Sequence, residues 1–411
     1  MLQNRSLVGK LFVPSLGAAF YSSYIIETLT NIFLPDVATT FFGSSNQISI
    51  AITAQLVTLS SVVSVFFGVL LGLLSVSYSH KRLLLLGNVC VFLGVIGCFF
   101  APDFLFMQIF FPIEGIGTAA IAAMSFTLVG ELLVLNKRPK AIGLIISCTA
   151  LGGISSSLVI NLFFSGAEGW RSYLLWFALP ISLVALTAVY FGVPSTPQKT
   201  KVVRKKAYLS SFKQVFLKKS AAACLIGFMV KQAAFAWSFI YCASFFRKEF
   251  GLSTEWVALV VFASLVAIFF ASVVGGYLVN RVGRKLQVVA TLVISTPPLV
   301  LIAFVPNLWI VLILHLTGVF VFYLGFPAGT NLILEQAPES RGTMMSMSTI
   351  FVTLGLGLGS ALGGAALVLS GWTGVILTFA VLELIAAAIF FFLTEDPCIK
   401  TETDLIKPRL S

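Results

Sequence analysis

The stretch Gly276-Tyr-Leu-Val-Asn-Arg-Val-Gly-Arg-Lys285 joins two long apolar runs through a short basic turn. Glycine permits tight turns and close helix contacts, so we expect Gly283 to form the turn and Gly276 to lie against a neighbouring helix. Basic side chains at such a turn favour the carboxyl end of a helix and attract nearby acids. The stretch therefore predicts two apolar helices connected by a tight, positively charged turn.

The same kind of turn occurs earlier in the chain, as His80-Lys81-Arg82. Other features recur in the same order at offsets of 202–204 residues: Glu131 and Lys137 as Glu335 and Arg341, and Gly169-Trp170 as Gly371-Trp372. Several ordered matches within a narrow window indicate an internal duplication. We expect two related halves.

The composition of the 411 residues excludes a soluble protein. Hydrophobic residues make up 58%, charged residues 10%, and the mean hydropathy is +1.03. A soluble chain has about 25% charged residues. The net charge of +11 is concentrated in the segment 194–219, which we expect to contact anionic lipid headgroups or to set topology rather than to bind nucleic acid.

The apolar runs predict twelve membrane-spanning helices, since a span needs about 20 apolar residues. They form an all-α polytopic membrane protein of two pseudo-symmetric six-helix bundles, 1–193 and 220–394, joined by the basic central loop 194–219 and followed by a tail at 395–411. The predicted spans are 11–34, 47–76, 83–101, 104–130, 140–164, 171–193, 220–246, 255–279, 286–305, 308–334, 342–369 and 373–394.

The basic residues predict the orientation. With twelve spans, the termini and the even-numbered loops share one side, and this side carries 22 of the 26 Lys and Arg. The other side has only Arg171, Arg247 and Lys248. By the positive-inside rule, both termini are cytoplasmic, and we expect a monomer in the plasma membrane.

The turn at 276–285 resembles the signature loop G-x-L-x-D-R-x-G-R-K of the major facilitator superfamily, with Asn280 at the aspartate position. The twelve spans, the central loop and Gly169-Trp170-Arg171 extend the resemblance over nearly the whole chain. Residues 27–38 and the glycines of 355–364 are similar to the arabinose-efflux and drug–proton antiporter branch. The sequence departs from that branch at Ser156-Ser157, where the antiporter motif has Gly-Pro.

Ionisable residues inside spans are candidates for function, because each costs roughly 2.5–3.5 kcal/mol at the centre of a bilayer. Glu27 and Lys231 lie in the equivalent first spans of the two halves, 204 residues apart, and we expect them to face one another across a central cavity. Glu114 is a second protonatable candidate or a helix-to-helix hydrogen-bond group, and His315 is a polar residue of the same cavity. Glu383 is interpreted as structural, because the resemblance places its span at the periphery.

A second set of residues is expected to act in conformation rather than in binding. The predicted cytoplasmic gate consists of basic and polar loop residues with two acids at helix ends: Lys81, Arg82, Asn280, Arg281, Arg284, Lys285, Glu131 and Glu335. The predicted packing glycines are Gly276, Gly283, Gly355, Gly359 and Gly363.

The sequence contains no phosphate loop and no zinc-binding motif, which argues against an enzyme and against ATP-driven transport. The resemblance implies a secondary transporter that needs no cofactor and uses an ion gradient, with H+ as the expected ion. We expect proton-coupled efflux of a small drug-like or sugar-like compound. The alternatives are a symporter or uniporter for uptake of a sugar or organic anion, and a non-transporting membrane receptor of transporter ancestry.

Overall fold

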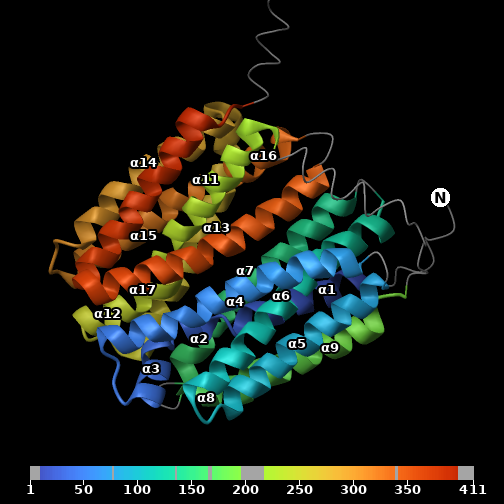
Figure 1. The fold of residues 1–411 in the computed structure, drawn as a ribbon, viewed down its shortest axis with the longest axis horizontal. Helices are drawn as coiled ribbons and strands as arrows, with labels where there is room; N and C mark the ends of the chain where they lie inside the picture. The colour runs from blue at the N-terminus through green and yellow to red at the C-terminus, as the bar shows by residue number, and fades with distance from the viewer. Residues whose placement is uncertain are drawn as a thin grey trace, which may run out of the picture. The chain divides into compact units, whose positions relative to one another are not determined.

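The computed structural model describes residues 10–75, 78–134, 137–164, 169–195, 217–337 and 341–396, which form helices and no strands (Figure 1). Most of the predicted central loop, 196–216, and the tail, 397–411, lie outside the described residues. The chain divides into two compact units. Unit 1 comprises residues 1–202 and 239–265, and unit 2 comprises residues 203–238 and 266–411.

Unit 1 begins with a first span in three pieces, α1 (Phe12–Ile25), α2 (Thr28–Asn31) and α3 (Leu34–Phe42). The long helices that follow are α4 (Gln47–Leu74), α5 (His80–Phe100), α6 (Phe104–Leu132) and α7 (Arg138–Phe163). The sixth span consists of α8 (Gly169–Tyr173), a π-helical turn at Leu174–Ala178 and α9 (Leu179–Gly192). Within this unit α1 packs against α7 and α9, and α6 packs against α4 and α5.

Unit 1 also contains α12 (Cys242–Glu249) and the beginning of α13 (Thr254–Val282). These residues belong to the second half of the sequence repeat. They are joined to the first half by side-chain contacts, among them Asn161 Nδ2, which donates to the carbonyl of Glu255 at 2.9 Å. The compact unit is therefore not the same as the repeated unit.

Unit 2 is built on α11 (Lys219–Ala236), which packs along α17 (Arg341–Ala388). Its other helices are α14 (Arg284–Ile302), α15 (Leu308–Leu324) and α16 (Phe326–Gln336), together with the end of α13. A π-helical turn at Trp237–Tyr241 follows α11, and another at Ile389–Leu393 follows α17. Phe228 and Phe390 meet edge-to-face in the buried core of this unit.

Ten helices of the described chain are long and apolar enough to cross a membrane. The difference from the predicted twelve has two causes. The first span is too broken to qualify, and the last two spans form one continuous 47-residue stretch, Met347–Leu393. That stretch is interrupted at Gly371, whose φ of 65° is open to glycine but strained for other residues.

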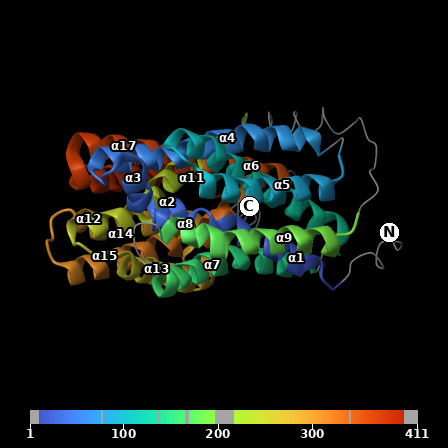
Figure 2. The same ribbon diagram turned by 90° about the horizontal axis from the view of Figure 1, so that it is seen from below.

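The first span breaks because of its sequence. Pro35 has no amide hydrogen, and its ring would clash with the carbonyl four residues earlier in a continuous helix. The helix therefore ends at Asn31, and α3 begins at Leu34 with the proline in its first turn. A second interruption at Ile26 and Glu27 places Glu27 in a turn between α1 and α2 (Figure 2).

Candidate functional site

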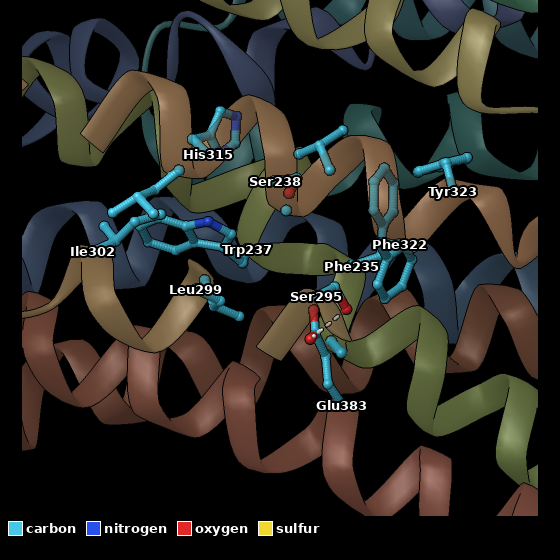
Figure 3. A pocket seen from close by; sticks show the side chains of 14 residues that line it. Phe235, Trp237, Ser238, Ser295, Leu299, Ile302, His315, Phe322, Tyr323 and Glu383 are labelled. Carbon is cyan, nitrogen blue, oxygen red and sulfur yellow. Dashed lines mark hydrogen bonds between the residues drawn. The ribbon is translucent and has the colours of Figure 1, made fainter. Parts of the chain in front are cut away.

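Unit 2 contains a pocket whose walls come from α11 and the π-helical turn after it, α14, α15 and α17 (Figure 3). The space between the atoms, mouth included, is about 370 Å³. Its lining is mainly aromatic and aliphatic, with a few polar groups: Ala234, Phe235, Trp237, Ser238, Ser295, Leu299, Ile302, Leu314, His315, Gly318, Val319, Phe322, Tyr323 and Glu383. An apolar cavity with a few polar groups is typical of small-molecule sites.

Glu383 is the acid of this pocket. It is buried on α17, and its Oε2 lies 2.8 Å from Ser295 Oγ and 3.0 Å from Thr296 Oγ1, both on α14. Figure 3 shows the Ser295 contact. The same two hydroxyls also lie 3.0 and 2.8 Å from the carbonyl oxygen of Leu292. Glu383 therefore shares its hydroxyl partners with a backbone acceptor.

Lys231 lies on α11 and is only 3% exposed. Its Nζ lies over three aromatic rings, at 4.9 Å from the centroid of Phe322, 5.6 Å from Phe326 and 5.7 Å from Phe228. It also interacts electrostatically with Glu383. Lys231 and Glu383 are thus the charged pair of unit 2, and sequence reasoning had assigned the acid to a structural role.

His315 lines the same pocket from α15 and is buried. Figure 3 shows it on the opposite wall from Glu383, with Trp237 between the two walls. The two predicted cavity residues Lys231 and His315 therefore belong to the surroundings of one pocket. Glu27 belongs to unit 1, and its expected pairing with Lys231 stays a prediction.

Unit 1 has a smaller pocket lined by polar residues of the broken first span, Tyr24, Glu27, Thr28 and Asn31, and by Ile32, Gly153, Ser157, Phe239, Val261 and Leu265. Glu27 is half-buried. Asn31 is 7% exposed, and its Oδ1 accepts no hydrogen bond from the residues that the structure describes. The break in the helix brings a carboxyl and an unsatisfied amide oxygen to one cavity.

Glu114 is buried in α6, where Gly94 of α5 lies against its backbone and Cβ. Thr118 Oγ1 donates to its Oε1 at 2.5 Å. Glu114 also interacts electrostatically with Glu27. Among the described residues, neither carboxyl forms an ion pair. Unit 1 thus holds two interacting acids in its membrane-spanning part.

An ion pair that sequence reasoning missed joins α3 to α12. Arg247 donates to Asp36 through two hydrogen bonds, Nη1 to Oδ2 at 2.5 Å and Nη2 to Oδ1 at 2.9 Å. Next to it, Lys248 Nζ donates to Ser45 Oγ. The signal in the sequence was that Arg247 and Lys248 are two of the three basic residues on the predicted outer side.

The predicted gate residues lie at helix ends. His80 Nδ1 is 2.9 Å from Glu131 Oε2, so Glu131 contacts the basic turn of its own half, and Lys81 donates to the carbonyl of Tyr190 at 2.8 Å. Arg82 and Arg281 are exposed, Arg284, Lys285 and Glu335 are half-buried, and the side chain of Asn280 lies outside the described part. A pairing of Arg281 or Arg284 with Glu335 stays a prediction.

The predicted packing glycines differ from one another. A Cβ at Gly355 would lie 2.2 Å from the carbonyl oxygen of Met229, and one at Gly359 would lie 2.3 Å from that of Ala233, so α17 closely contacts α11 at both. Gly363 is buried, and Gly283, with φ of 87°, precedes α14. Gly276 is a correction, because a Cβ there would meet nothing within 4 Å.

The close contact lies one residue earlier. A Cβ at Gly275 would lie 2.3 Å from the carbonyl oxygen of Leu324. One residue corresponds to about 100° around a helix, so Gly276 faces away from that neighbour.

The Major Facilitator Superfamily model matches residues 16–247 and 233–410. An uncharacterized MFS-type transporter of Bacillus subtilis, YbcL, is 22% identical over 322 residues, which are 77% of this chain and 80% of the relative. The chain therefore belongs to the major facilitator superfamily, a family of membrane transporters. The resemblance seen in the sequence is confirmed at the level of the superfamily, and the arabinose-efflux branch stays a prediction.

Solved structures share the fold. A bacterial homologue of the human lysosomal transporter Spinster, inward-facing and unoccupied, matches with a TM-score of 0.79 and 17% identity, covering 96% of this chain and 97% of that one. A D-xylose-proton symporter matches with a TM-score of 0.77 and 16% identity, covering 94% and 97%. The expected fold class, an all-α polytopic membrane protein of the major facilitator type, is confirmed.

Proposed function

We propose that this protein is a proton-coupled secondary transporter that exports a small amphiphilic molecule by alternating access, with the protonatable site in unit 1. The observation that carries the proposal is the pair of interacting acids, Glu27 and Glu114, in the membrane-spanning part of one unit. Neither forms an ion pair among the described residues.

Two carboxylates in one poorly hydrated site repel each other, and a shared proton removes this cost. Glu27 lines a cavity, whereas Glu114 is enclosed by α5 and by its bond to Thr118. Glu27 is therefore the group that exchanges the proton, and Glu114 makes that proton necessary. A ligand that favours one protonation state then couples its own movement to that of the proton.

Proton coupling is tested in everted membrane vesicles, in which an exporter accumulates its solute in the lumen in exchange for lumenal protons. The probes are ethidium, benzenesulfonate and D-xylose, which represent a cation, an anion and a sugar. We expect at least one probe to accumulate only with the proton gradient present, and Glu27→Gln to abolish accumulation while the protein stays inserted.

A matched control is Glu255→Gln, because Glu255 contributes only its backbone carbonyl to the printed contact with Asn161. Accumulation by Glu27→Gln at the wild-type level would remove Glu27 as the carrier. Accumulation that persists after a protonophore collapses the gradient would remove proton coupling itself.

A second candidate is a symporter that takes up a sugar with a proton. The observation that favours it is the fold shared with a D-xylose-proton symporter. Right-side-out vesicles separate the two candidates, since a symporter accumulates D-xylose in them when the outside is acidic, and an exporter does not.

A further inference from the structure

The ammonium of Lys231 lacks a hydrogen-bond acceptor among the described residues, although its side chain is only 3% exposed. Its contacts are the faces of three phenylalanines. Cation–π contacts favour a cation but do not saturate the three N–H donors of an ammonium. A buried ammonium with free donors next to an apolar pocket is suited to receive an acceptor group from a ligand.

The hydroxyls around Glu383 allow that acid to exist with or without a proton. Each hydroxyl has one hydrogen, yet Ser295 and Thr296 each lie within hydrogen-bond distance of both Glu383 and the carbonyl of Leu292. When Glu383 is ionised, both hydroxyls donate to it. When Glu383 is protonated, it donates to one hydroxyl, which turns its own hydrogen to the carbonyl of Leu292.

We propose that the pocket of unit 2 binds a small organic anion with a flat apolar body, whose anionic group binds Lys231 while Glu383 takes up one proton. The empty pocket holds one positive and one negative group. The occupied pocket holds the ammonium, the bound anion and a neutral Glu383, so its net charge is unchanged. This avoids the cost of an added charge in a low-dielectric site.

The aromatic lining specifies the body of the ligand. Phe235, Phe322 and Tyr323 form one group of rings in mutual contact, with centroids 5.2–6.1 Å apart, and Trp237 lies across the pocket from Glu383 (Figure 3). Flat rings stack well against such walls. An aromatic carboxylate combines the ring with the acceptor that Lys231 needs.

The titratable groups around the pocket come from three helices: Lys231 from α11, His315 and Tyr323 from α15, and Glu383 from α17. From α14 only the hydroxyls of Ser295 and Thr296 reach Glu383. The inference rests on the proposed transport function, because it names the class of the transported solute. Binding itself can be measured without transport.

The test uses benzoate, benzamide and benzamidine, which have nearly the same shape and carry a negative, no and a positive charge. Their binding to the purified full-length protein in detergent is measured by titration calorimetry between about pH 6 and about pH 8, where benzoate stays ionised. Two buffers of different ionisation enthalpy give the number of protons taken up per bound ligand.

We expect benzoate to bind about tenfold or more tightly than benzamide, in keeping with a charge-assisted hydrogen bond, and benzamidine to bind least. About one proton is taken up per benzoate, so affinity rises as the pH falls. Lys231→Gln removes the preference for benzoate, and Glu383→Gln keeps it but abolishes proton uptake. Lys219→Gln, an exposed lysine of the same helix, is the control and behaves as wild type.

His315→Asn separates the two titratable groups, because proton uptake that disappears in this variant and persists in Glu383→Gln overturns the role of Glu383. Tighter binding of benzamidine than of benzoate would assign the pocket to cations, and equal binding of all three would make it merely apolar. Either result overturns the proposal, and both come from the wild-type protein alone. Failure of vesicle transport with intact benzoate binding would count only against the proposed function.

Discussion

Asp36 and Arg247 are a pair in which each residue depends on the other. Both are largely buried, and the two hydrogen bonds between them form a bidentate contact across 211 positions of the chain. Asp36→Asn leaves a guanidinium without its counter-charge, and loss of one partner of a buried pair costs about 3–5 kcal/mol. We expect a clear drop in the thermal unfolding temperature of the purified protein.

The reversed pair, Asp36→Arg with Arg247→Asp, restores opposite charges at the same place, so it should be more stable than either single variant. Asp103→Asn is the control, because Asp103 is exposed and caps only the start of α6. Equal unfolding temperatures for Asp36→Asn and Asp103→Asn would show that the ion pair contributes nothing measurable.

At the residue scale, the sequence identified buried charges but not their partners. Glu27, Lys231 and Glu114 stood out because a charge inside an apolar run is costly wherever the helix faces. The partner of a buried charge depends on the direction in which each helix turns its side chains, which one sequence does not contain. For that reason the Lys231 and Glu383 neighbourhood and the Asp36 and Arg247 pair emerge only from the structure.

At the scale of an element, the contact of α17 with α11 depends on glycine. Gly355→Ala would place a methyl group 2.2 Å from the carbonyl oxygen of Met229, and a backbone atom cannot move away cheaply. We expect this variant to unfold at a clearly lower temperature in detergent, because overpacking costs about 1–3 kcal/mol.

Gly276→Ala is the matched control, because a Cβ there meets open space and alanine favours a helix by about 1 kcal/mol over glycine. Its unfolding temperature should stay the same or rise. If Gly355→Ala were as stable as Gly276→Ala, the two helices could not be in backbone contact at this position.

Element boundaries were predictable wherever a strong local signal marked them. The short turns before α6 and α15 begin with a proline, and Asp103 and Asn307 cap the helices that follow, as expected for tight outer turns. The first span was predicted as one helix because its hydropathy is continuous. Pro35 was the signal for its second break, whereas the turn at Glu27 has no marker that a sequence pattern would recognise.

At the scale of the whole molecule, the distribution of basic residues predicts the orientation in the membrane. In a background without the six cysteines, we expect Asp103→Cys to react with an impermeant maleimide from outside the cell. Arg82→Cys should react only after the membrane is permeabilised. Both positions are exposed, so a difference between them reports the side of the membrane and not burial. The opposite labelling pattern would invert the predicted topology.

The duplication and the number of spans could be predicted because both are written in local hydropathy and in repeated motifs. The division into compact units could not. Residues 239–265 belong to the second repeat by sequence, and to unit 1 by contact. Which half a helix end adheres to is decided by side chains such as Arg247 and Asn161, which carry no repeat signal.

The π-helical turn Trp237–Tyr241 also determines the angular phase of everything that follows it. Such a turn accommodates one more residue than an α-helical turn. Removing one residue would close it to an α-helix and rotate α12 by about 100° around its axis. Arg247 would then point away from Asp36, while Trp237 and Ser238, at the beginning of the turn, would keep their places at the pocket of unit 2. A single inserted residue thus fixes which way the last two turns of this span face.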